Sequence, residues 1–158
     1  MAFLVVFLLF LSPNYGVFGQ EVTEPIALTE EDWTKFATVE VMTADFLAKK
    51  TKELKTWVRS KKDLGGGARF NEIKGVWGNL EKETSISITV EEKAAYKAYL
   101  DQQASLQKEV IAYQVELIRD EKLLGTDLYQ QIATLVQEDP TLKEKLDQEI
   151  RRLKKKRR

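Results

Sequence analysis

The densest groups of side chains that could do chemistry in this sequence are carboxylates. Glu30, Glu31 and Asp32 stand together, and Glu91 and Glu92 form a second group. A bundle that holds two metal ions between carboxylates needs Glu-x-x-His on its helices, and the chain contains no His. Both groups stand where a helix is expected to begin, so we interpret them as capping residues rather than as a catalytic or metal site.

Residue types that the chain lacks exclude several classes of enzyme. Without His and Cys, it can hold no nucleophilic Cys, no His-dependent triad and no ordinary zinc site. The glycines 65–67 lack the Gly-Lys-Ser/Thr that ends a phosphate loop, and they are expected to follow a helix, so they predict a hinge or turn. We therefore expect neither a cofactor nor a metal, and an enzyme that uses carboxylates or Lys is only the third hypothesis for function.

Aromatic residues are the first candidates for binding a partner. They recur at helical spacing, for which packing in the core is the default interpretation, but Tyr and Trp are also enriched at binding hot spots. Trp77 is the strongest candidate because Gly75 and Gly78 flank it and favour its display near a helix end. The predicted partner contacts are Trp77, Tyr96, Tyr99 and Tyr113.

The C-terminus is a second candidate binding site because its charge differs from that of the body. The chain has 25 basic and 25 acidic residues, yet residues 150–158 hold seven basic and no acidic ones. This segment is either a solvated helix end or a contact for an anionic partner, such as an acidic protein, lipid head groups, lipopolysaccharide or a cell-wall polymer. Nucleic acid is not expected, because the body is acidic and the chain is expected to be exported. The candidate contacts are Arg151, Arg152, Lys154, Lys155, Lys156, Arg157 and Arg158.

The first half of the chain predicts a long helix and a short one. Thr29 can cap a helix that extends to about Lys62, with apolar residues recurring along one face. The glycines that follow end it. A short amphipathic helix between Phe70 and Leu80 and a linker over 83–88 are then expected.

The second half of the chain predicts three further helices. Thr89 and Glu92 form a capping box that opens the longest helix, roughly 90–123, with Gly125 as its C-terminal glycine. A fourth helix starts at Thr126 or Asp127. Asp139 and the proline after it open the last helix, which leads into the basic segment.

The N-terminus carries the pattern of a secretory signal peptide. Residues 2–11 are ten apolar residues without a charge, followed by small residues at Val17 and Gly19. This matches a signal peptide cut before Gln20, and the run is shorter than the roughly 20 residues of a transmembrane helix. No Lys or Arg precedes the run. Because small secreted domains usually carry disulfides, the absence of Cys favours the bacterial periplasm, with secretion or the cell surface as alternatives.

These patterns predict an all-α, elongated bundle in which two long helices pack antiparallel beside two or three short ones. The expected organisation is a signal peptide (1–19), an extended lead-in (20–28), a helical domain (29–150) and a polybasic tail (151–158). The first functional hypothesis is a non-catalytic exported protein that binds a protein partner in the bacterial cell envelope, as an accessory or structural subunit of an envelope or appendage assembly. The alternative is a periplasmic chaperone or stress-sensing protein.

Overall fold

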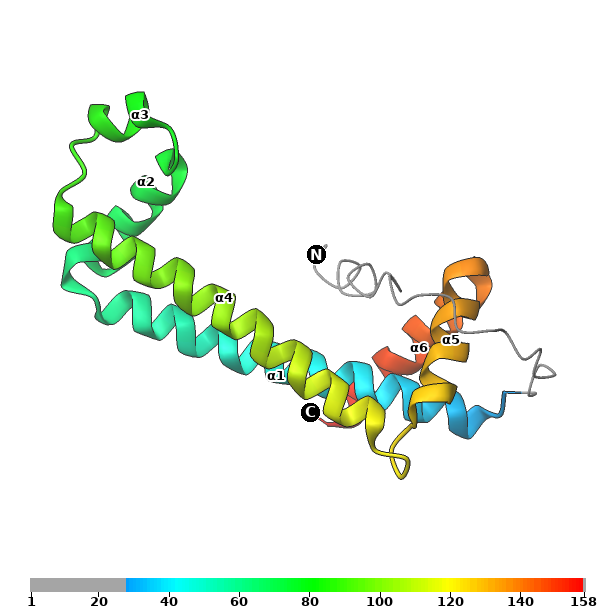
Figure 1. Ribbon diagram of the computed structural model, residues 1–158. Coiled ribbons are helices and arrows are strands. Elements are labelled where there is room, and N and C mark those ends of the chain that lie inside the picture. The colour runs from blue at the N-terminus through cyan, green and yellow to red at the C-terminus, as the bar shows by residue number, and fades with distance from the viewer. Residues whose placement is uncertain (1–27, 158) are drawn as a thin grey trace. The chain divides into compact units, whose positions relative to one another are not determined.

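The computed structural model describes residues 28–157 (Figure 1). Helices account for nearly all of this part of the chain and it contains no strand, which confirms the all-α class. The predicted signal peptide and all but the last residue of the lead-in lie outside the described residues. The elements are α1 (Glu30–Ser60), the 3₁₀ helix η1 (Lys62–Gly67), α2 (Ala68–Val76), α3 (Leu80–Ser85), α4 (Val90–Arg119), α5 (Thr126–Glu138) and α6 (Pro140–Lys156).

At the starts of the two long helices, the predicted capping function is confirmed for one acid of each group, Asp32 and Glu92. The Asp32 amide donates to Thr29 Oγ1 at 3.2 Å and the Thr29 amide donates to Asp32 Oδ2 at 2.8 Å. At the second start, the Glu92 amide donates to Thr89 Oγ1 at 3.2 Å and the Thr89 amide to Glu92 Oε2 at 2.9 Å. Each pair satisfies two backbone donors that would otherwise lack partners at a helix start.

The described chain divides into two compact units, and the described part of unit 1 consists of residues 28–38 and 120–157. Its described part contains the start of α1 together with α5 and α6. Phe36 is fully buried and stacks on Tyr129 with ring centroids 5.2 Å apart. The other buried apolar residues of this unit are Trp33, Ala37, Leu124, Ile132, Val136, Leu146 and Ile150. Apolar residues one or two turns apart on α5 and α6 thus form a core with the first turns of α1.

Unit 2 is Val39–Arg119 and contains the rest of α1, η1, α2, α3 and α4. One buried cluster of this unit joins Val58 of α1, Leu64 of η1, Ile73 of α2 and Tyr96 of α4. Partly buried residues pack against this cluster: Trp57, Phe70, Trp77, Ile86, Ile88, Ala95, Tyr99 and Leu100. Residues from four elements therefore close the end of the unit where the chain passes from α1 to α4.

The segment after α2 differs from the sequence prediction. One amphipathic helix reaching Leu80 was expected, but α2 ends at Val76 and Gly78 adopts a left-handed φ of 83°. Asn79 then caps α3, its Oδ1 accepting from the Lys82 amide at 3.1 Å. Leu80 therefore starts a new helix and is 78% exposed rather than on the buried face. Residues 83–85, expected in a linker, belong to α3.

Two further boundaries differ from their predictions. The helix expected to be the longest and to reach about residue 123 ends at Arg119, and its 30 residues make it one residue shorter than α1. Asp120 organises a turn after it, in which Asp120 Oδ1 accepts from the Lys122 amide at 2.9 Å. Gly125, expected as the C-terminal glycine of that helix, is the N-cap of α5 with φ 83°. The last helix continues to Lys156, so most of the basic segment is helical.

Candidate interaction surfaces

Three of the four aromatic residues predicted to contact a partner belong to one cluster in unit 2. The ring centroids of Trp77 and Tyr96 are 4.5 Å apart, and those of Tyr96 and Tyr99 are 5.5 Å apart. Phe70 packs edge-on against Tyr99 at 4.7 Å. Tyr96 is only 3% exposed, while Trp77 and Tyr99 are half-buried. Of the three predicted contacts in this cluster, Trp77 and Tyr99 are therefore the ones whose side chains remain partly exposed.

The fourth residue, Tyr113, lies apart from this cluster, where α4 faces α1 within unit 2. Its ring stacks on Phe46 of α1 with centroids 4.3 Å apart. Lys50 Nζ lies 2.5 Å from Glu109 Oε2 and 5.5 Å from the Phe46 ring centroid. Tyr113 is therefore half-buried between the helices, with an ion pair beside it.

A carboxylate on α1 faces the same helix. Gln114 is 6% exposed, and its Nε2 donates to Glu40 Oε1 at 3.5 Å. Burial raises the pKa of Glu40 to about 7, and the hydrogen bond from Gln114 only partly opposes this rise. One turn along α1, the buried Thr43 hydroxyl lacks a hydrogen-bond partner among the described residues. This stretch of α1 thus buries polar groups that are weakly satisfied.

An ion-pair network that the sequence did not predict holds the start of α4. Arg69 Nε lies 2.6 Å from Glu92 Oε1 and Arg69 Nη2 lies 2.9 Å from Glu92 Oε2, and Nη2 also donates to the carbonyl oxygen of Ile86 at 3.0 Å. The arginine holds the pKa of Glu92 below its usual range, with help from the Thr89 amide. Glu83, 9% exposed, accepts from the Gly78 amide at 2.8 Å and pairs with Lys93 at 3.1 Å. These contacts tie α2 and α3 to α4.

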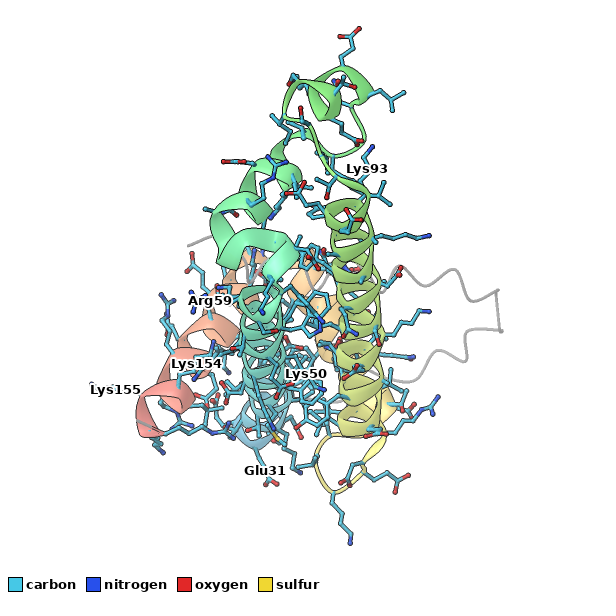
Figure 2. The ribbon with its side chains drawn as sticks, turned by 90° about the vertical axis from the view of Figure 1, so that its left-hand side faces the viewer. Glu31, Lys50, Arg59, Lys93, Lys154 and Lys155 are labelled. Carbon is cyan, nitrogen blue, oxygen red and sulfur yellow. The ribbon has the colours of Figure 1, made fainter. Side chains whose placement is uncertain are left out.

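The predicted basic contacts lie on the last turns of α6 and just beyond them. Arg151, Lys155, Lys156 and Arg157 are exposed, whereas Lys154 is half-buried. Figure 2 labels Lys154 and Lys155 on this helix. Arg152 is exposed and forms an ion pair with Glu149, whose Oε1 also accepts from Thr34 Oγ1 at 3.0 Å. Arg158 lies outside the described residues. Because α6 buries Leu146 and Ile150, its apolar face is anchored in unit 1 while Arg151 and Lys155 lie on its outer side.

Within residues 28–157 no helix is both long and apolar enough to cross a membrane. The same residues contain no group of three or more acidic side chains arranged to hold a metal ion. Comparisons with protein-family models, curated proteins and solved structures found no match.

Proposed function

We propose that this chain is a non-catalytic exported protein that binds a protein partner in the bacterial cell envelope, as an accessory or structural subunit of an envelope or appendage assembly. The observation that carries the proposal is the basic end of α6. Arg151, Lys155 and Lys156 are exposed on a helix whose other face is buried. A helical anchor holds these cations in a fixed arrangement, which reduces the conformational entropy lost when an anionic partner binds.

The arrangement of α1 and α4 supports a rigid binding scaffold. We infer that these helices pair antiparallel within unit 2, because residue numbers fall along α4 as they rise along α1. Glu40 meets Gln114, Phe46 meets Tyr113 and Lys50 meets Glu109. Two helices held by contacts of this kind can present exposed side chains at defined spacings.

Export is the part of the proposal that rests on the sequence of the N-terminus. A cut before Gln20 would release a mature chain that retains all of the described residues. N-terminal sequencing of the protein recovered from a bacterial periplasm should begin at Gln20 or within a few residues. Recovery of intact Met1 would contradict the proposed export.

Co-purification from a native cell envelope tests partner binding directly. The full chain should capture a defined partner at fixed stoichiometry, and Arg151→Gln/Lys155→Gln/Lys156→Gln should weaken that capture. The matched control is Lys62→Gln/Lys82→Gln/Lys122→Gln, which removes three exposed positive charges from other segments. Equal loss in both variants, or the absence of any stoichiometric partner, would overturn the proposal.

A periplasmic chaperone is the second candidate because large apolar residues are exposed in unit 2. Leu80 is 78%, Val90 79% and Ile111 48% exposed. Single apolar residues on a surface are common, but a chaperone would use such residues to hold unfolded chains. This candidate predicts that the full chain suppresses the aggregation of unrelated client proteins and that Leu80→Gln/Val90→Gln reduces the effect. If no client is protected, the chaperone function is excluded.

A further inference from the structure

A row of unpaired cations runs along the second half of α1. Lys49, Lys52, Lys55 and Arg59 are all exposed, and none of them forms an ion pair with another residue in 28–157. We call these four residues the α1 basic stripe. In contrast, the neighbouring Lys50 contacts Glu109 at 2.5 Å and Glu53 at 3.9 Å. Figure 2 shows Lys50 on the side of α1 that faces α4 and Arg59 on another side.

The fold itself does not account for the α1 basic stripe. Its members are three or four residues apart, so each lies next to another cation on the helix surface, and like charges at this spacing destabilise a helix. The helix dipole favours cations in the last turn, and Arg59 is the basic residue of α1 in that turn. Lys49 and Lys52 lie too far from the helix end to benefit. The repulsion within the stripe would be relieved by an anionic partner.

The spacing and the surroundings of the stripe point to an acidic helix as that partner. One cation per turn repeats along α1 at about the 5.4 Å helical pitch, and Lys49 to Arg59 spans about 15 Å. A helix with one carboxylate per turn repeats with the same period, so several ion pairs can form at once.

The same face lacks the features that a lipid or nucleic-acid contact would use. Its other exposed residues include Ala48, Glu53, Thr56 and Ser60, and none of these can insert into a bilayer as an interfacial helix requires. Trp57, which could stack on a base, packs against the core cluster, and Lys61 Nζ lies 4.7 Å from its ring centroid.

We infer that the α1 basic stripe is a docking site for an acidic helix of a partner protein. This inference rests on the proposed protein-binding function and names the chemistry of one contact, which is separate from the basic end of α6.

The probe for this inference is a synthetic helical peptide with one Glu per turn, compared with a peptide in which Gln replaces each Glu. Fluorescence anisotropy with the full chain should show binding of the Glu peptide that weakens as salt is added. Lys52→Gln/Lys55→Gln/Arg59→Gln should reduce affinity by about tenfold. The control Lys74→Gln/Lys97→Gln/Lys108→Gln removes the same charge from α2 and α4 and should change affinity by less than about twofold.

Several outcomes would overturn the docking site. The first is equal binding of the Glu and Gln peptides, and the second is an equal loss of peptide affinity in the stripe and control variants. The third is stripe-dependent binding of phosphatidylglycerol vesicles or duplex DNA without binding of the Glu peptide. Circular dichroism of both variants shows whether the helices persist. If the peptide fails while the full chain still captures an envelope partner, the stripe assignment is wrong and the proposed function stands. If no partner is captured, the proposed function is wrong whatever the peptide does.

Discussion

The Arg69 guanidinium forms a bidentate ion pair with the Glu92 carboxylate, with Nε 2.6 Å from Oε1 and Nη2 2.9 Å from Oε2. Glu92 is also the third helical residue of α4, where it accepts from the Thr89 amide. The Glu92 carboxylate thus caps α4 and also links α4 to α2 through Arg69. Arg69 additionally reaches the carbonyl oxygens of Ile86 and Ser87, so its planar group organises the whole connection from α3 to α4.

Replacing Arg69 by Lys should lower the thermal stability of the protein. Lysine keeps the positive charge, but a single ammonium cannot reproduce the forked contact with Glu92 and the two carbonyl contacts at once. Thermal unfolding followed by circular dichroism should give a lower Tm for Arg69→Lys. The control is Arg59→Lys, because Arg59 forms no ion pair within residues 28–157. Equal Tm values for the two variants would show that the network contributes nothing.

Glu40 should make the stability of the protein fall as the pH rises from 5 to 8. Its pKa is about 7 in the folded chain against 4.5 for an ordinary Glu, because the carboxylate is buried. The folded state therefore retains a proton that the unfolded state releases. The contribution of Glu40 to the free energy of unfolding is at its full value below about pH 4.5 and is lost as the pH rises through 7. Carboxylates with lowered pKa values, such as Glu92, stop stabilising the folded protein only when they are protonated at lower pH. They therefore do not change the stability between pH 5 and 8.

The substitution Glu40→Gln should remove most of this pH dependence. At pH 8 the variant should be more stable than the wild type by about 2–3 kcal/mol, and near pH 5 the two should be similar. Urea unfolding at pH 5, 6, 7 and 8 measures the difference. Glu116→Gln, an exposed substitution on α4, should leave the slope of stability against pH unchanged. A flat pH profile for the wild type would show that Glu40 is ionised at no cost.

Features that depend on neighbouring residues could be predicted from the sequence, whereas those that join distant segments could not. Thr89 and Glu92 stand three residues apart, so their capping box could be predicted from the sequence, and the structure confirms it. Arg69 meets Glu92 across 23 positions, and no local pattern marks that partnership. Glu40 likewise accepts a hydrogen bond from Gln114, which is 74 positions away.

The candidate site shows the same division. The aromatic spacing on α4 predicted that Tyr96 and Tyr99 share a helical face, but their packing against Trp77 and Phe70 joins α4 to residues about 20–30 positions earlier in the chain. The α1 basic stripe has a purely local spacing of three and four residues. What the sequence alone could not indicate is which lysines have ion partners, because that depends on the neighbouring helix.

Replacing Thr43 by Val should stabilise the protein. The Thr43 hydroxyl is buried and lacks a hydrogen-bond partner within the described residues, so the fold loses the hydration of that group without compensation. Valine has nearly the same shape, and Thr43→Val should raise the free energy of unfolding by about 1 kcal/mol. Thr38→Val is the matched control, because the Thr38 hydroxyl donates to the Thr34 carbonyl oxygen at 2.7 Å and its loss should give no gain. A gain of equal size in both variants would attribute the effect to general hydrophobicity.

Loss of the Ile73 side chain should destabilise the protein far more than loss of the Leu80 side chain. Sequence periodicity places both on one buried face, yet Leu80 is 78% exposed and Ile73 is fully buried in the unit 2 cluster. Ile73→Ala should therefore cost about 2–5 kcal/mol through lost burial and the cavity it leaves. Leu80→Ala removes little buried surface and should change stability by less than about 0.5 kcal/mol. Urea unfolding at one pH compares the two. A large loss of stability for Leu80→Ala would mean that Leu80 is covered in solution, either by the protein itself or by a second copy. Repeating the measurement at several protein concentrations separates these causes, because only a contact between copies depends on concentration.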